Sequence, residues 1–196
     1  MNGLIVTFAV GGLLTLSILG FHNLMTTNSR EATLGTITKE RMNSVVDLIT
    51  NDFNKVGYQS TSTPVIQTMD STDFRFWSDV FEDDSFGATS IRWRWRTNSS
   101  VADTASSNPN DYYLQRTGPV SNSTVGTTNI PVTYFHVRYL DDNGAVTTNS
   151  VLVRKIEVEV IIESPEPYRY DGEGTAYYYR SAWKRTFVPN NINLPY

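Results

Sequence analysis

The feature that most constrains this chain is an apolar segment near its N-terminus. Residues 4–24, LIVTFAVGGLLTLSILGFHNL, contain no Asp, Glu, Lys or Arg, and His22 is the only titratable side chain among them. A helix of about 20 apolar residues spans the hydrocarbon core of a bilayer. Gly11, Gly12 and Gly20 are small residues of the kind that let helices approach closely. The segment predicts a helix surrounded by lipid or by other apolar helices.

Three interpretations of this segment compete. A secretory signal peptide would need basic residues before its apolar part and small residues at a cleavage site after it, whereas the first Lys or Arg is Arg30. A plain membrane anchor usually has basic residues on its cytoplasmic flank, and that flank is bare here. The third interpretation, which the bare flank favours, is a chain already trimmed of a basic leader, with Met1 as the processed N-terminus.

The helix is predicted to continue beyond the apolar segment. Residues 30–56 contain no proline, and their apolar side chains recur mostly at intervals of three and four, which places them on one helix face. Gly57 follows as a helix stop signal. The sequence thus predicts one helix of about 50 residues, roughly 75–80 Å long. The residues expected to pack it on a sheet are Leu34, Ile37, Met42, Val45, Ile49 and Phe53.

From residue 58 onward the sequence predicts a β-rich head. Apolar and polar residues alternate in runs separated by turn residues, which is typical of antiparallel strands. Residues 141–144, Asp-Asp-Asn-Gly, are a strong hairpin signal. The Ser-, Thr- and Asn-rich stretches 98–110 and 121–129 are predicted to be surface loops. The expected strands are 74–80, 90–97, 112–116, 133–140, 151–162 and 175–187.

The last two expected strands carry complementary charges. Glu157 and Glu159 share one face of the earlier strand, and Arg180 and Lys184 share one face of the later strand. Antiparallel pairing would place acids opposite bases. The expected fold class is α+β, with an apolar helix over 1–29, its amphipathic continuation over 30–57 and a β-rich head over 58–196.

Charge and composition exclude several classes of function. The net charge of -4 and the pI near 5.1 give no reason to expect a nucleic acid as partner. The stretch 92–96, Arg-Trp-Arg-Trp-Arg, alternates strictly and is interpreted as a half-buried strand with a charged outer face. The chain has no cysteine, which excludes disulfides, Cys-ligated metals and thiol catalysis.

The sequence offers little material for catalysis or metal binding. No triad or metal cluster can be built on His22 and His136 from their spacing, so neither an enzyme nor a cofactor is predicted. The acidic cluster 82–84, with Asp79 before it, could hold calcium through its oxygen ligands, but a solvated acidic turn is the favoured interpretation. Asn98 and Asn122 match the N-glycosylation pattern. A cluster of tyrosines near the C-terminus is interpreted as a binding face or, as is more usual for aromatic residues at alternate strand positions, as part of the core or of a subunit interface. Its members are Tyr168, Tyr170, Tyr177, Tyr178 and Tyr179.

This layout resembles the type IV pilin superfamily, which includes pilins, type II secretion pseudopilins and related archaeal filaments. The resemblance lies in the near-terminal apolar helix, its amphipathic continuation and the antiparallel sheet behind it. The segment 47–58, DLITNDFNKVGY, is similar to the end of the long helix in the minor pilin and pseudopilin branch. The tail 185–194, RTFVPNNINL, is similar to the ending of that branch.

The resemblance implies a subunit that begins at a cleaved and often methylated Met1. Such subunits wait in the inner membrane with their heads outside the cytoplasm. A dedicated assembly machinery, driven by an ATPase, then extracts them into an extracellular homopolymeric or mixed filament. The residues expected to form the filament core are Leu4, Ile5, Val6, Phe8, Val10, Leu13, Leu14, Leu16, Ile18, Leu19 and Phe21.

One departure from the family pattern concerns position 5. Most family members have Glu there, where it meets the N-terminal amine of a neighbouring subunit, whereas this chain has Ile5. His22 stands where many pilins have a kinking proline. Three explanations remain open: the register differs, another contact satisfies the amine, or this subunit sits at a filament tip. Because no acidic residue lies between Met1 and Leu24, packing of apolar side chains is expected to hold the core bundle without a buried carboxylate.

Two other classes of function remain open from the sequence. The first is a single-pass membrane-anchored binding module, such as an adhesin or a carbohydrate-binding head, that never polymerises. The amphipathic stretch 30–56 argues weakly against it, because a simple anchor needs no such continuous helix. The second is an anchored enzyme, which the missing polar constellation disfavours.

Overall fold

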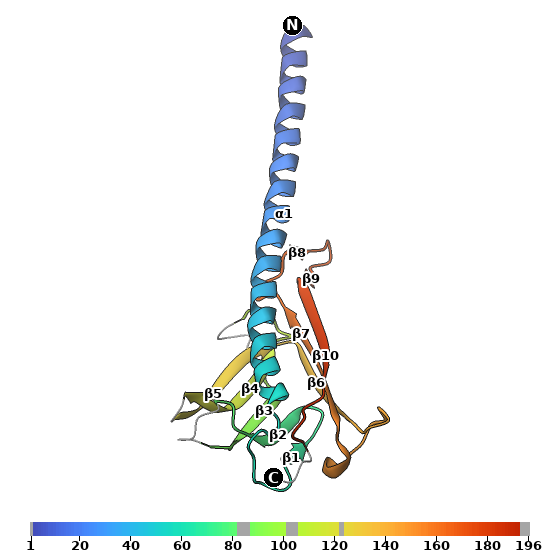
Figure 1. Ribbon diagram of the computed structural model, residues 1–196. Coiled ribbons are helices and arrows are strands. Elements are labelled where there is room, and N and C mark those ends of the chain that lie inside the picture. The colour runs from blue at the N-terminus through green and yellow to red at the C-terminus, as the bar shows by residue number, and fades with distance from the viewer. Residues whose placement is uncertain (1, 82–86, 101–105, 122–123, 193–196) are drawn as a thin grey trace.

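The computed structural model describes residues 2–81, 87–100, 106–121 and 124–192, which form a helical stalk and a β-rich head (Figure 1). Helix α1 (Asn2–Asn54) has 53 residues, a length of about 80 Å at about 1.5 Å per residue. Its N-terminal half stands clear of the head, and its C-terminal half lies along it. The α+β class with one long N-terminal helix is confirmed.

The head contains two larger antiparallel sheets and a small hairpin. Sheet A has five strands that are neighbours in chain order: β1 (Ile66–Met69), β2 (Asp73–Ser78), β3 (Thr89–Ser100), β4 (Tyr112–Ser121) and β5 (Thr124–Val132). Sheet B has three strands in the order β10 (Arg180–Phe187), β7 (Lys155–Glu163) and β6 (Tyr134–Leu140). The hairpin pairs β8 (Arg169–Tyr170) with β9 (Ala176–Tyr177). A 3-10 helix, η1 (Ser150–Leu152), precedes β7.

The predicted pairing of the last two long strands is confirmed. Strands β7 and β10 are antiparallel, with Lys184 opposite Glu159 and Arg180 opposite Glu163. Lys184 Nζ also lies 3.1 Å from Glu157 Oε1. The alternation around Trp93 is confirmed as well, since Trp93 is buried while Arg92 donates a 2.8 Å hydrogen bond to Asp73 on the outer face.

Other strand predictions were wrong in their bounds. Most of the predicted loop 121–129 is strand β5, which pairs with β4 along its length. The hydrogen bonds of this pairing are made by the backbone, so a Thr- and Asn-rich composition does not prevent it. The predicted strand 151–162 begins only at Lys155, because the Asn149 side chain caps a 3-10 turn by accepting from Val151 N at 3.0 Å. The predicted strand 175–187 is divided into β9 and β10. Strand β1 was not predicted, since four residues are too few to show an alternation.

The hairpin signal at 141–144 forms a turn but does not lead directly into β7. Gly144 N donates to Asp141 O at 3.1 Å, and Asp141 N donates to Ala145 O at 2.9 Å. The turn returns the chain to an isolated bridge between Leu140 and Val146. Residues 147–154, which include η1, separate this bridge from the start of β7 at Lys155.

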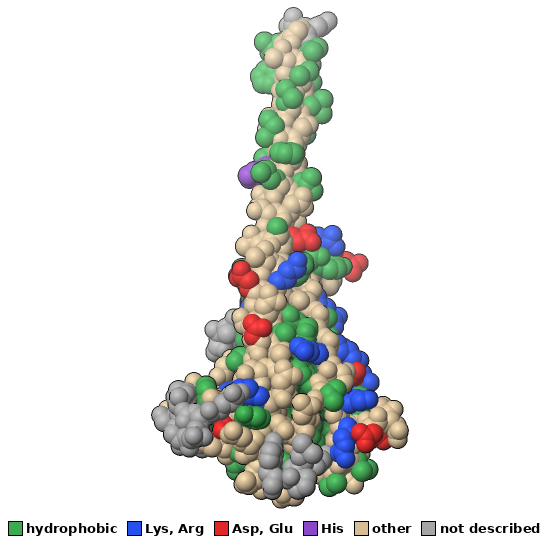
Figure 2. Space-filling model, viewed as in Figure 1, with side chains coloured by type: hydrophobic (Ala, Val, Ile, Leu, Met, Phe, Trp, Pro, Cys, Tyr) green, Lys and Arg blue, Asp and Glu red, His purple; other side chains and the backbone are tan. Residues whose placement is uncertain are grey.

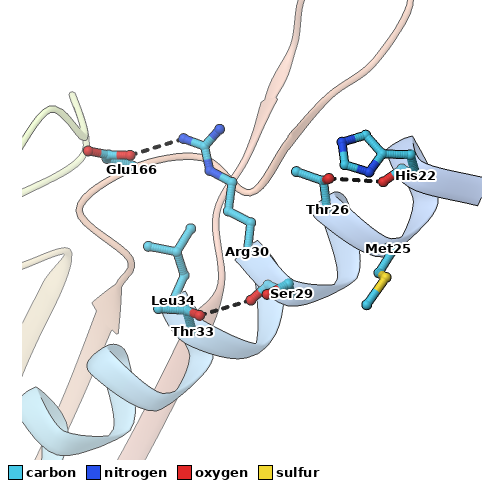
Figure 3. A pocket seen from close by; sticks show the side chains of 8 residues that line it. All are labelled: His22, Met25, Thr26, Ser29, Arg30, Thr33, Leu34 and Glu166. Atoms are coloured by element: carbon cyan, nitrogen blue, oxygen red, sulfur yellow. Dashed lines mark hydrogen bonds and ion pairs between the residues drawn. The ribbon is translucent and has the colours of Figure 1, made fainter. Parts of the chain in front are cut away.

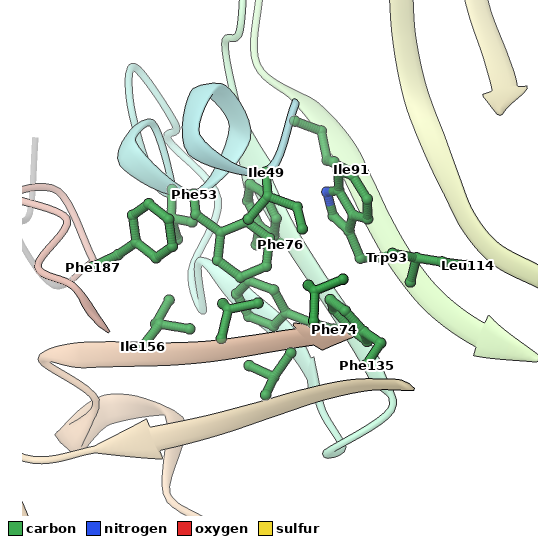
Figure 4. Close-up of a cluster of buried hydrophobic side chains, with 14 of the residues drawn as sticks. Ile49, Phe53, Phe74, Phe76, Ile91, Trp93, Leu114, Phe135, Ile156 and Phe187 are labelled. Carbon is green, nitrogen blue, oxygen red and sulfur yellow. The ribbon is translucent and has the colours of Figure 1, made fainter. Parts of the chain in front are cut away.

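The hydrophobic core lies between the sheets and the C-terminal part of α1 (Figure 4). The Phe53 ring of α1 is fully buried, and its centroid lies 5.2 Å from that of Phe74 and 6.3 Å from that of Trp93 in sheet A. The Phe187 ring of β10 lies 5.4 Å from it on the other side. One side chain of α1 therefore contacts both sheets.

The predicted packing stripe of α1 is buried at every position except one. Leu34, Met42, Val45, Ile49 and Phe53 are at most 7% exposed, whereas Ile37 is 38% exposed and does not belong to the stripe. At about 100° per residue, the buried positions cover an arc of roughly 100° and Ile37 falls outside it. Sequence spacing of three from Leu34 was not enough to place Ile37 on the buried face.

Candidate assembly surface on the N-terminal helix

An apolar surface without a partner in the chain covers the free half of α1. Every residue that the sequence assigned to a filament core is exposed, from 51% at Val10 to 76% at Phe8. In the view of Figure 2, hydrophobic side chains lie along the free part of the helix, and no acidic or basic side chain is seen among them. We call residues 3–24 the apolar stalk. Exposed apolar surface of this extent marks a protein or membrane interaction site.

The three hydroxyl side chains of the apolar stalk donate hydrogen bonds within the helix. Thr7 Oγ1 donates to Gly3 O, and Thr15 Oγ1 donates to Gly11 O, each at 2.9 Å. Ser17 Oγ donates to Leu13 O at 2.9 Å. Hydroxyls bonded in this way add little cost when a helix enters an apolar environment. The surface is therefore suited to burial on all sides.

Four glycines leave flat areas on the same surface. A Cβ placed at Gly3, Gly11, Gly12 or Gly20 would meet nothing within 4 Å. Small residues allow the backbones of two helices to approach closely in an apolar environment. The apolar stalk thus combines large side chains with places where another helix can lie close to it.

The length of the apolar stalk matches a membrane. In the part of the chain that the structure describes, α1 is the one helix long and apolar enough to cross a bilayer. Residues 3–24 extend over about 33 Å at about 1.5 Å per residue, and the hydrocarbon core of a bilayer is about 30 Å thick. The helix is therefore a possible membrane anchor.

A groove of about 590 Å³ marks the point where α1 enters the head (Figure 3). It is lined on the helix by His22, Met25 and Leu34, among others, and on the head side by Glu166. Arg30 crosses the groove, and its Nη2 lies 3.0 Å from Glu166 Oε2. Both charged side chains are about half exposed. The ion pair joins the helix to the segment between β7 and β10.

A buried ion pair further along α1 was missed by sequence reasoning. Asp52 is fully buried, and its Oδ2 accepts from Arg116 Nε of β4 at 2.6 Å and from Trp93 Nε1 of β3 at 2.8 Å. Arg116 Nη2 donates to Asp52 Oδ1 at 2.9 Å, which makes the contact bidentate. The signal was available, because Asp52 lies three residues after Ile49 on the apolar stripe.

A second polar cluster lies where α1 passes the start of β4. Asp111 is fully buried, and burial raises the pKa of its carboxyl group. Thr133 Oγ1 donates to Asp111 Oδ1 at 3.1 Å. Arg41 of α1 donates to Pro131 O at 3.4 Å and to Glu163 O at 3.5 Å, and burial lowers the pKa of its guanidinium. These groups attach the helix to the strands.

The remaining predicted sites are not brought together into a further centre. Asn98 is exposed on β3, whereas Met1, the acidic cluster 82–84 and Asn122 lie outside the described residues. Asp79 is buried beside the end of β2. Among the described residues no group of three or more His, Asp or Glu side chains is arranged to hold a metal. His136 stacks on Tyr134, with ring centroids 6.1 Å apart.

No protein-family model matches the chain, and no curated protein or solved structure matches it significantly.

Proposed function

We propose that this chain is a structural subunit of an extracellular type IV pilus-like filament, which assembles through its N-terminal helix. The observation that supports the proposal is the apolar stalk, which is exposed on all sides although the head already has a complete core. A head that needed only a tether would not require a rigid helix continuous from residue 2 to residue 54.

The proposed mechanism is the transfer of the apolar stalk from lipid to other stalks. In the membrane the stalk is surrounded by acyl chains, so close packing of the helices favours their association and the hydrophobic effect does not. Once a subunit leaves the membrane, each large apolar side chain that returned to water would cost about 1.5–3 kcal/mol. Mutual burial of the stalks avoids this cost, and the assembly machinery supplies the work of extraction.

The core bundle of the proposed filament would contain no carboxylate from the apolar stalk. Ile5 is 65% exposed in the single chain and presents only aliphatic surface to a neighbour. Shape and close helix approach at the glycines, rather than a charged contact, would then set the spacing of subunits.

Substitution of Leu14 by lysine tests the filament. Leu14 is 59% exposed at the middle of the apolar stalk, and a lysine there would bury an unpaired charge in the bundle. We expect Leu14→Lys to abolish the filaments that electron microscopy detects after shearing of cells. The matched control is Val146→Lys, because Val146 is 68% exposed in a loop of the head and should tolerate the charge.

Mass spectrometry of sheared filaments provides the complementary test. Filaments made of this chain, with a free or methylated Met1, would agree with a processed pilin. Normal filaments from Leu14→Lys would refute the proposed packing.

The second candidate is a membrane-anchored binding module, which the membrane-spanning length of α1 also supports. In that case the chain would remain in the membrane fraction, and no filament containing it would be sheared from cells.

A further inference from the structure

The segment between β7 and β10 forms an arm beside the helix. Ser164 N donates to Tyr179 O at 2.8 Å, Tyr168 N donates to Tyr177 O at 2.9 Å, and the turn closes with Asp171 N donating to Thr175 O at 3.0 Å. Figure 1 shows the β8–β9 part of this segment beyond the end of β10 and next to α1. We call residues 164–179 the neck arm.

Contacts with α1 hold the neck arm against the helix. Besides the Arg30–Glu166 ion pair, the Tyr179 ring lies over Gly35, where a Cβ would come within 3.1 Å of Tyr179 Cε2. A groove further toward the N-terminus is lined by Gly20 and Leu24 of the helix together with Tyr168 and Arg169 of the arm. The arm thus reaches the helix level at which the apolar stalk ends.

This level is where the head-group layer of a bilayer would lie. The apolar stalk is about 33 Å long, close to the roughly 30 Å of a hydrocarbon core. When the stalk fills that core, residues 20–24 are at its edge. The neck arm beside them is then in the layer of phospholipid head groups.

The side chains of the neck arm suit a zwitterionic head-group layer. Tyr170 is 60% exposed and Tyr177 is 37% exposed, and tyrosine is enriched where a bilayer meets water. Arg169 stacks over the Tyr177 ring, with Cζ 4.6 Å from the centroid, and guanidinium groups bind phosphate. Glu173 at the tip is exposed and can face an ammonium group.

We propose that the neck arm rests on the head-group layer of the bilayer that holds α1, with zwitterionic phospholipids as its ligands. This inference rests on the membrane-inserted state within the proposed function, and it does not require a filament. The contact would hold the head in one orientation relative to the membrane, and it would be released when the subunit is extracted.

Site-specific fluorescence tests the proposal on the full chain. The native chain has no cysteine, so Gly172→Cys at the tip of the arm accepts a single fluorophore and leaves the tyrosines in place. A Cβ at Gly172 meets nothing within 4 Å. Val146→Cys in the head loop and Leu14→Cys in the stalk serve as controls. Each labelled chain is placed in phosphatidylcholine vesicles that carry a nitroxide quencher on the head group or in the acyl chain, and circular dichroism checks the fold.

The expected result is head-group quenching several-fold stronger at Gly172→Cys than at Val146→Cys, with acyl-chain quenching at Leu14→Cys. Adding Tyr170→Ser and Tyr177→Ser should reduce the quenching at position 172. Equal quenching at 172 and 146, while position 14 is in the acyl region, would overturn the arm contact and leave the filament proposal standing. No quenching at position 14 would instead overturn membrane insertion itself.

Dilution of the protein with lipid separates the bilayer from a second copy of the chain. Quenching at position 172 should not change with the protein-to-lipid ratio. Access of a water-soluble quencher to position 172 gives a second reading. If the position is protected from that quencher and the protection is lost when the protein is diluted with lipid, another subunit covers the arm, and the lipid contact is overturned.

Discussion

At the scale of single residues, the ion pair between Asp52 and Arg116 joins the long helix to sheet A. The side chain of Asp52 is fully buried and that of Arg116 is 7% exposed. Removing one partner of such a pair leaves the other as an uncompensated buried charge. Trp93 Nε1 would lose its hydrogen-bond acceptor at the same time. The pair therefore makes the docking of α1 sensitive to a single substitution.

We expect Asp52→Ala to lower the free energy of unfolding by about 3–5 kcal/mol, as measured by chemical denaturation of the full chain in detergent micelles. The control is Glu166→Ala, which removes the exposed pair with Arg30 and should cost about 0–1 kcal/mol. Equal effects of the two substitutions would contradict the role assigned to burial.

At the scale of elements, the end of α1 depends on a glycine. The helix ends at Asn54, two residues before the predicted end, and Gly57 follows with a φ of 80°. Its amide donates to Trp77 O of β2 at 2.9 Å. A Cβ at this position would lie 2.3 Å from Asn191 O. Only glycine satisfies both the backbone conformation and the close approach of the C-terminal segment.

The matched pair Gly57→Ala and Gly144→Ala separates these two requirements. Gly144 has the same φ of 80°, but a Cβ there meets nothing within 4 Å. Thermal denaturation should show that Gly144→Ala lowers the free energy of unfolding by about 1–2 kcal/mol, because alanine is disfavoured in the left-handed conformation by about that amount. Gly57→Ala should cost clearly more, because backbone atoms must also move. If the two substitutions destabilise the chain equally, the C-terminal segment around Asn191 moves away from position 57 without a cost in free energy.

At the scale of the whole molecule, the head does not need the apolar stalk for its hydrophobic core. The buried side chains of α1 begin at Leu34, and the apolar stalk makes no contribution to the core cluster. The head therefore has its own core, while the apolar side chains of the stalk stay exposed in the single chain.

Removal of residues 1–29 is expected to leave a folded and soluble head. Its unfolding midpoint should lie within about 2–4 °C of that of the full chain, a shift that corresponds to about 1 kcal/mol for a chain of this size. Removal of residues 1–45 provides the contrast, because it takes away Leu34, Met42 and Val45 and should prevent cooperative unfolding. Calorimetry of both truncated chains checks this, and aggregation of the first would disprove the independence of the head.

The sequence by itself determined the features that depend on local periodicity. The apolar run 4–24 and the repeat of three and four in 30–56 predicted one helix with two different halves. The alternation in 155–163 and the charges of Arg180 and Lys184 predicted the pairing of β7 with β10. The location of the exposed apolar surface followed from the same patterns, whereas its role in a filament stays a prediction.

Only the tertiary structure decided which distant groups meet. Asp52 and Arg116 are 64 positions apart, Ile37 is exposed although its spacing suggested burial, and residues 124–132 form a strand despite a loop-like composition. The neck arm reaches the end of the apolar stalk only because β7 and β10 hold its base beside α1. Periodicity is a property of neighbouring residues, but the partner of a buried charge, or the edge that a strand extends, is set by packing of the whole chain.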